Sequence, residues 1–186
     1  MHNKSLDISA SSDWLNNGKI LIHPTEAVWG IGCDAFNKNS FLRVHELKKR
    51  PTNKSFILLA GSYESAKYYL KDIKDSDINF LNTVWPGHVT VLLKYNKNLP
   101  EHLTNSTGKI AIRVSNHYPL KTIFKRFNGL MVSTSANISG ENPINNFDQI
   151  IDTFGDKDVA YYDALLGDNK SPSKIIDLES RNIIRN

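Results

Sequence analysis

The chain has 186 residues, of which 40% are apolar and 23% are charged, a composition typical of a globular protein with one domain over residues 1–186. No stretch approaches the ~18 apolar residues that a membrane span needs, and residues 1–7 lack the apolar core of a secretion signal, so we expect a cytoplasmic protein with no membrane partner. The net charge of +4 is compatible with either a nucleotide or RNA as an anionic partner.

The first part of the chain predicts a helix, a strand and a glycine loop. Apolar residues at helical spacing indicate a helix over residues 6–17, and residues 19–23 form an apolar run typical of a buried strand. In the stretch 24–33 that follows, Gly30 and Gly32 have no Cβ and tolerate positive φ. We therefore predict a loop whose backbone closely approaches a ligand.

A cationic cluster follows this loop. Asn39 or Ser40 is predicted to N-cap a helix that ends at Pro51 and carries Lys48 and Arg50 at its C-terminus. A guanidinium fork and backbone N–H groups both match phosphate oxygens, so the cluster indicates an anion site. A solvated helix end with no ligand is the alternative, because basic residues favour helix C-termini in any case.

The rest of the chain alternates between strands and helices, which is typical of an α/β fold. A polar, glycine-ended loop at residues 135–140 directly follows a strand, and we expect it to share one cleft with the first loop. Crowded late strands predict a mixed, twisted sheet with flanking helices. Residues 167–172 are predicted to be mobile. We expect strands over residues 55–60, 88–94, 109–114, 130–133, 159–162, 174–178 and 182–185, and helices over residues 62–70, 77–84, 118–127 and 147–154.

Several familiar motifs are absent from the sequence. There is no GxxxxGK[ST] element, and the first loop lacks the third glycine of a dinucleotide fingerprint. The six histidines show no zinc spacing, and no G-x-S-x-G elbow supports a serine hydrolase. Cys33 beside the glycine loop is either a nucleophile or, as we favour, a buried inert thiol.

A set of polar donors remains that suits phosphoryl or nucleotidyl transfer by electrostatic stabilisation, with no protein nucleophile. A triphosphate substrate brings its own Mg²⁺, so no protein metal site is expected. The alternative role for Arg113 is an ion pair with a surface carboxylate. The alternative for Ser135 and Asn137 is that their loop hydrogen-bonds its own backbone. The donors are Thr25, Lys48, Arg50, Lys54, Arg113, Ser133, Ser135 and Asn137.

Five segments stand out when they are taken together: Pro24–Cys33, Leu47–Pro51, Trp85–Gly87 followed by a Val-Thr strand, Ala111–Val114 and Ser133–Gly140. In order and spacing they resemble the YrdC/TsaC family of threonylcarbamoyl-AMP synthases. The resemblance extends to Ser171–Asp177 and the final Ile-Ile-Arg, so it covers nearly the whole chain. It implies a single-domain, twisted α/β sheet with a large basic concave cleft.

The resemblance also implies a reaction and its partners. L-Threonine, bicarbonate and ATP are condensed to L-threonylcarbamoyl-AMP with release of pyrophosphate, and a transfer complex then modifies tRNAs that read ANN codons. Direct tRNA binding is a further expectation. Two alternatives stay open, namely a non-enzymatic module that binds double-stranded RNA or tRNA, and a carbamoyl-transfer domain like that of hydrogenase maturation factors.

By the same resemblance, site roles fall on particular residues. Lys48 and Arg50 form a KxR pair and Ser135 and Asn137 an SxN pair, which together are expected to be catalytic and to hold ATP. Lys54 and Arg185 are expected to add ATP contacts. Arg113 is expected to bind the threonine carboxylate, with Thr25, Ser133 and Ser173 beside it. Ala27 and Leu59 stand where longer family members carry a hydroxyl and a histidine, so the contacts to the threonine side chain differ here.

Overall fold

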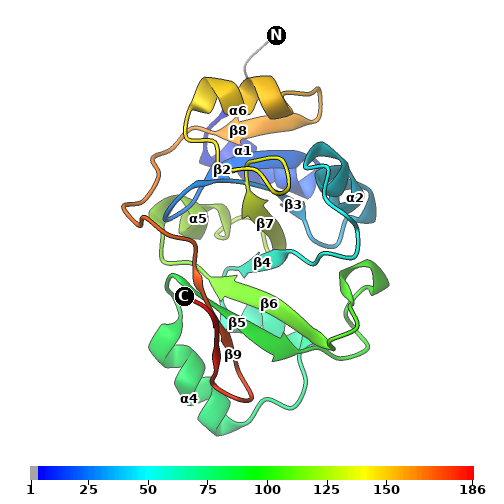
Figure 1. Ribbon diagram of the computed structural model, residues 1–186, viewed down its shortest axis with the longest axis vertical. Coiled ribbons are helices and arrows are strands. Elements are labelled where there is room, and N and C mark those ends of the chain that lie inside the picture. Colours follow the sequence, from blue (N-terminus) through cyan, green and yellow to red (C-terminus); the bar gives the residue numbers. More distant parts are fainter. Residues whose placement is uncertain (1–3) are drawn as a thin grey trace.

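The computed structural model describes residues 4–186, which are built around one mixed sheet of ten strands (Figure 1). The strand order is β1-β8-β2-β3-β7-β4-β6-β5-β9-β10. Parallel and antiparallel neighbours alternate irregularly along this order, so the predicted mixed α/β sheet is confirmed. The strands are β1 Ser5–Leu6, β2 Ile20–Pro24, β3 Trp29–Asp34, β4 Ile57–Ala60, β5 Val89–Lys94, β6 Lys109–Val114, β7 Met131–Ser135, β8 Val159–Tyr162, β9 Lys174–Asp177 and β10 Ile183–Arg185.

Helices pack on both faces of the sheet. None of those in residues 4–186 combines the length and hydrophobicity needed to span a membrane. The helices are α1 Ile8–Asn16, α2 Lys38–Leu47, α3 Tyr63–Ala66, α4 Asp75–Val84, α5 Tyr118–Ile123 and α6 Phe147–Phe154, with 3₁₀ turns η1 Lys67–Tyr69 and η2 Glu101–Leu103.

Two apolar clusters lie on opposite faces of the sheet because alternate residues of a strand point to opposite sides. On β2, Ile20 and Ile22 belong to the larger cluster, which also contains residues of α2, α4 and α6. Leu21 belongs to the smaller cluster, in which α1 and α5 pack on the sheet. The smaller cluster covers only part of its face.

The predicted glycine loop is wrong for most of its length, because Gly30 and Gly32 lie in strand β3. Neither of these glycines has positive φ, whereas Gly18, Gly108 and Gly140 do. A Cβ on Gly30 would lie 2.5 Å from the His23 ring, and one on Gly32 would lie 1.9 Å from the Val132 carbonyl oxygen. The glycines therefore make room for an imidazole and a neighbouring strand.

Other boundaries shift less. The helix predicted from Asn39 or Ser40 begins at Lys38, because the side chain of Asn37 accepts the N-cap hydrogen bond from Ser40. The helix predicted to reach Phe127 ends at Ile123. The short strand β1 was not predicted, since two residues carry too little pattern to detect.

The connection between β8 and β9, residues 163–173, runs along one side of the molecule and is called the β8–β9 strap here (Figure 1). The strap includes the segment predicted to be mobile, and it is bonded by its backbone to the turn after β2. Gly167 N–H donates to the Thr25 carbonyl at 2.9 Å, and Asn169 N–H donates to the Glu26 carbonyl at 2.8 Å. A Cβ on Gly167 would lie 2.7 Å from the Glu26 carbonyl oxygen, so this close approach requires glycine.

Candidate functional site

Strand register places the candidate polar residues on one face of the sheet. Leu21 and Met131 point into the smaller apolar cluster, so His23 and Ser133, each two residues further along, lie on the same face. Arg113 pairs with Leu59, another member of that cluster. The face is thus apolar under α1 and α5 and polar beyond them.

The first group of predicted residues gathers where α2 ends and β7 ends. Lys48 is only 2% exposed, and its Nζ donates to the carbonyl oxygens of Ser135 at 2.5 Å and Asn137 at 2.6 Å. Burial, with a smaller contribution from the charge of Arg50, lowers the pKa of Lys48 to about 8. Within residues 4–186, Lys48 is therefore a largely desolvated cation whose hydrogen-bond partners are two backbone carbonyls.

The SxN loop beyond β7 is closed on itself, as the alternative interpretation of Ser135 and Asn137 foresaw. Ser135 Oγ donates to Asn137 Oδ1, and Asn137 Nδ2 donates to the carbonyls of Ile138 and Glu141, both at 2.8 Å. Ser139 N–H also donates to the Lys48 carbonyl at 2.8 Å. These bonds join the loop to the end of α2, so the KxR and SxN elements are adjacent.

Arg50 and Lys54 lie on the loop that follows α2. Arg50 donates through Nε to the Lys54 carbonyl at 3.3 Å and through Nη2 to the Ser55 carbonyl at 2.8 Å, and its guanidinium lies 5.1 Å from the Phe56 ring centre. Burial lowers the pKa of Arg50. Lys54 is exposed to solvent.

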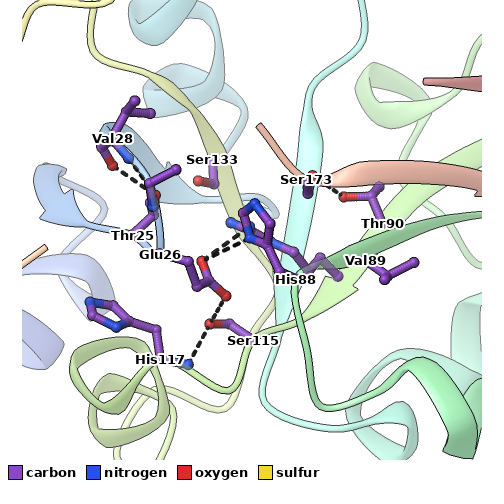
Figure 2. A network of polar contacts seen from close by, with 12 residues as sticks. Thr25, Glu26, Val28, His88, Val89, Thr90, Ser115, His117, Ser133 and Ser173 are labelled. Atoms are coloured by element: carbon purple, nitrogen blue, oxygen red, sulfur yellow. Dashed lines mark hydrogen bonds and ion pairs between the residues drawn. The ribbon is translucent and has the colours of Figure 1, made fainter. Parts of the chain in front are cut away.

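The second group centres on Arg113, and Figure 2 shows its neighbours Glu26, His88 and Ser115. Its Nη1 lies 3.1 Å from Glu26 Oε2 and 3.1 Å from His88 Nδ1. The two side chains are buried, with 7% of Arg113 and 9% of Glu26 exposed, so the surface ion pair considered for Arg113 is wrong. Glu26 Oε1 accepts from Ser115 Oγ at 2.6 Å.

Arg113 and Glu26 stabilise each other in their charged forms. Burial on its own would raise the pKa of Glu26, but the charge of Arg113 and the hydrogen bond from Ser115 bring the pKa below its usual value. Burial lowers the pKa of Arg113, while Glu26 opposes that shift. Two of the pair's atoms, Arg113 Nε and Glu26 Oε2, are buried and make no hydrogen bond.

The remaining predicted residues surround this pair. Ser173 Oγ lies 2.8 Å from Thr90 Oγ1, and Arg185 Nη2 donates to the Ser173 carbonyl at 2.8 Å, which places Arg185 beside the Arg113 group and not beside Lys48. Thr25 Oγ1 donates to the Val28 carbonyl at 2.7 Å, so this hydroxyl closes a turn next to Glu26. Leu59 is fully buried in the smaller apolar cluster.

Four polar residues of this site were not predicted from the sequence: Glu26, His23, His88 and Ser115. Glu26 directly follows Thr25, which was predicted to bind threonine, and this adjacency was the signal available. His23 is buried completely, with Nε2 3.4 Å from Ser133 Oγ. Alternation along β2 could have indicated that it faces Ser133.

His23 should make the protein sensitive to acid. Burial, and to a lesser extent the charge of Arg113, lowers its pKa from 6.5 to about 4. The unfolded chain therefore takes up a proton between pH 6.5 and 4 that the folded chain does not, and stability is lost as the pH falls through this range. At pH 4.5 we expect His23 to account for a decrease of about 2–3 kcal/mol in the free energy of unfolding relative to pH 7.

Urea denaturation of the wild type and His23→Gln at both pH values measures this decrease. Glutamine can still bond Ser133 but does not titrate, so the variant should lack that component of the acid loss. Equal losses in the two proteins would contradict the assignment to His23.

Two further expectations concern nucleophiles and metals. Cys33 is buried in the larger apolar cluster, and burial raises the pKa of its thiol, which fits the inert thiol and not the nucleophile. In the part of the chain from Lys4 onwards, no group of three or more His, Cys, Asp or Glu side chains is placed to hold a metal ion.

The chain matches known proteins over most of its length. A family model named for Sua5, YciO and YrdC and described as "Telomere recombination" matches residues 13–186. A threonylcarbamoyl-AMP synthase from Acinetobacter baumannii is 33% identical over 96% of this chain and 97% of its own length. Its counterpart from Pseudoalteromonas translucida is 35% identical over 96% of both chains.

Solved structures show the same fold. Pyrococcus abyssi Sua5, described as "P. abyssi Sua5 complexed with L-threonine", aligns with a TM-score of 0.84 at 23% identity, over 95% of this chain and 54% of the Sua5 chain. Escherichia coli YciO aligns with a TM-score of 0.82 at 21% identity, over 96% of this chain and 88% of its own. This chain thus spans about half of the Sua5 chain and nearly all of the bacterial relatives.

Proposed function

Because this chain belongs to the Sua5/YciO/YrdC family, we propose that it is a threonylcarbamoyl-AMP synthase of tRNA modification. The observation that carries the proposal is the full-length match to bacterial proteins of that name, together with the family fold. It favours an enzyme over a non-enzymatic RNA-binding module. ATP and L-threonine are the substrates, with bicarbonate as the carbon source and Mg²⁺ entering with ATP.

The two polar groups suit two different substrates. Lys48, Arg50, Ser135 and Asn137 would hold the ATP phosphates, because a desolvated ammonium is stabilised by an arriving anion. Lys54 lies at the same loop and would extend this contact.

Arg113 would bind the threonine carboxylate through its unpaired Nε edge. Ser133 and Ser173 lie on the same face and would position the substrate, as would Thr25 through its turn. Arg185 touches Ser173, so we place its ATP contact where the nucleotide meets the amino acid.

The chemistry needs positioning and charge stabilisation more than a protein nucleophile. The neutral threonine amine adds to CO₂ formed from bicarbonate and gives a carbamate, and the amine proton and the hydroxide of bicarbonate leave together as water. A carbamate oxygen then attacks the α-phosphorus of ATP. The bond from that phosphorus to the β-phosphate oxygen breaks, and the pyrophosphate leaves with the charge that Lys48 and Arg50 would stabilise. Such electrostatic stabilisation is strongest in a site that excludes water, as the burial of Lys48 indicates.

One assay tests this function. The purified protein is incubated with ATP, Mg²⁺, L-threonine and bicarbonate, and with each mixture lacking one of them. We expect pyrophosphate release only in the complete mixture, and a product with the mass of threonylcarbamoyl-adenylate. ATP hydrolysis without that product would contradict the proposal.

The product is a mixed anhydride that hydrolyses readily. We therefore expect the enzyme that uses this product to act close to the synthase. We place the protein in the cytoplasm with a tRNA threonylcarbamoyl-transfer complex as its partner. Direct tRNA binding would show as salt-dependent affinity that does not require turnover.

A further inference from the structure

The Arg113 group contains two buried atoms of opposite kind that lack partners. Arg113 Nε is a donor and Glu26 Oε2 is an acceptor, and each is shielded from solvent without a hydrogen bond. Buried polar groups are almost always satisfied, so a pair of exceptions in one cluster calls for a ligand. The two atoms belong to side chains whose Nη1 and Oε2 are 3.1 Å apart.

A structural ion pair alone does not account for this geometry. Glu26 Oε2 is close enough to Arg113 Nη1 for a hydrogen bond but is not aligned for one. Arg113 Nη1 instead has a hydrogen-bond partner in His88 Nδ1 at 3.1 Å. A carboxylate whose only task was to orient Arg113 would be expected to take a bidentate, aligned pair.

Glu26 is held rigidly in this position from the other side. Its Oε1 accepts from Ser115 Oγ at 2.6 Å, and its backbone carbonyl accepts from Asn169 of the β8–β9 strap at 2.8 Å. These bonds leave Oε2 as the carboxylate oxygen nearest Arg113. The acceptor is therefore fixed in place before any ligand arrives.

A free α-amino acid carries the two complementary groups one carbon apart. Its carboxylate can accept from Arg113 Nε, and its ammonium can donate to Glu26 Oε2. We propose that Glu26 binds the amino group of the amino-acid substrate, beside the Arg113 guanidinium that binds its carboxylate. This inference rests on the proposed function, since it adds the amine contact to the threonine site.

Access to this pair depends on His88. Its side chain is 22% exposed, more than Glu26 or Arg113, and its Nε2 donates to the Ser171 carbonyl of the strap at 2.9 Å. The ring lies against both partners, with Nδ1 3.1 Å from Arg113 Nη1 and 3.7 Å from Glu26 Oε2, so its rotation would open space beside both. The entering amino acid would take the place of His88 at Arg113.

The test compares two ligands that differ only in the amine. Calorimetric titration gives the dissociation constants of L-threonine and of (R)-3-hydroxybutyrate, which has the same carboxylate and hydroxyl but no amino group. We expect the wild type to bind threonine at least tenfold more tightly, which is the lower value of a charge-assisted hydrogen bond. Glu26→Gln keeps the size of the side chain and removes its charge, and we expect it to lose this preference.

Each outcome decides between roles. If Glu26→Gln raises the dissociation constants of both ligands by the same factor, Glu26 only orients Arg113 and the inference is wrong. If the wild type itself binds both ligands equally, the inference is also wrong, although the carboxylate site at Arg113 stands; this result does not depend on whether the variant folds. If the wild type binds neither ligand, the proposed threonine site fails, and the inference fails with it.

Discussion

Replacing Lys48 with methionine is expected to reduce ATP-dependent pyrophosphate release by about a hundredfold or more. The ammonium bonds the carbonyls of Ser135 and Asn137, and in the proposed mechanism it also stabilises the leaving pyrophosphate. Each charged hydrogen bond contributes roughly 1.5–3 kcal/mol, or ten- to hundredfold in a rate or binding constant. Steady-state pyrophosphate release at saturating threonine measures the effect.

A neighbouring lysine provides the control for this variant. Lys49 is exposed, so Lys49→Met removes the same charge from the surface of the same loop and should leave the rate within about twofold. A similar loss in both variants would mean that general positive charge, and not the buried ammonium, is what matters.

The pH dependence of the wild type gives an independent check. Because burial lowers the pKa of Lys48 to about 8, ATP affinity should be constant below pH 8 and fall above it, by up to about tenfold per pH unit. Lys48→Arg carries a charge that does not titrate in this range, so its ATP affinity should not fall in the same way.

Arg113→Met is expected to affect both stability and threonine use. The variant leaves the carboxylate of Glu26 buried without its counter-charge, which should lower the free energy of unfolding by about 3–5 kcal/mol. It also removes the donor proposed for the threonine carboxylate, so we expect the KM for threonine to rise by at least tenfold while the KM for ATP changes little. Urea denaturation and initial-rate kinetics measure the two effects.

Two comparisons separate these effects. Arg43 bonds Glu46 at 3.0 Å and Asp156 at 2.5 Å but is 43% exposed, so Arg43→Met should cost less than about 1 kcal/mol. The double variant Arg113→Met, Glu26→Gln removes the unpaired charge and should recover part of the stability, but not threonine use. If Arg113→Met were no more destabilising than Arg43→Met, the buried pair would not be the cause.

Most helices and strands could be predicted from the sequence because the signals that mark them are local. Strand β6 and helix α6 have the predicted bounds, since apolar periodicity and flanking polar residues mark both ends. Strand β3 was mistaken for a loop because Gly30 and Gly32 also mark turns. Their actual role depends on the His23 ring and on Val132, which come from other strands.

The site was predicted unevenly for a similar reason. Lys48 and the SxN loop belong to short motifs, and the structure joins them as predicted. The position of Arg185 beside Ser173 depends on the pairing of β9 and β10, which spacing does not reveal. Glu26 was not predicted as a site residue because its role depends on contact with Arg113, which lies far away in the sequence. The large basic concave cleft stays a prediction.

The seam between β4 and β7 has a consequence for catalysis. Just three residue pairs join these strands, from Ile57↔Ser133 to Leu59↔Met131. Ser133 and Ser135 lie on the β7 side of this seam, and Arg113 lies on the β6 side. In the proposed mechanism, strand β4 would therefore set the spacing between the β7 and β6 residues assigned to the substrates, although we assign β4 itself no substrate contact.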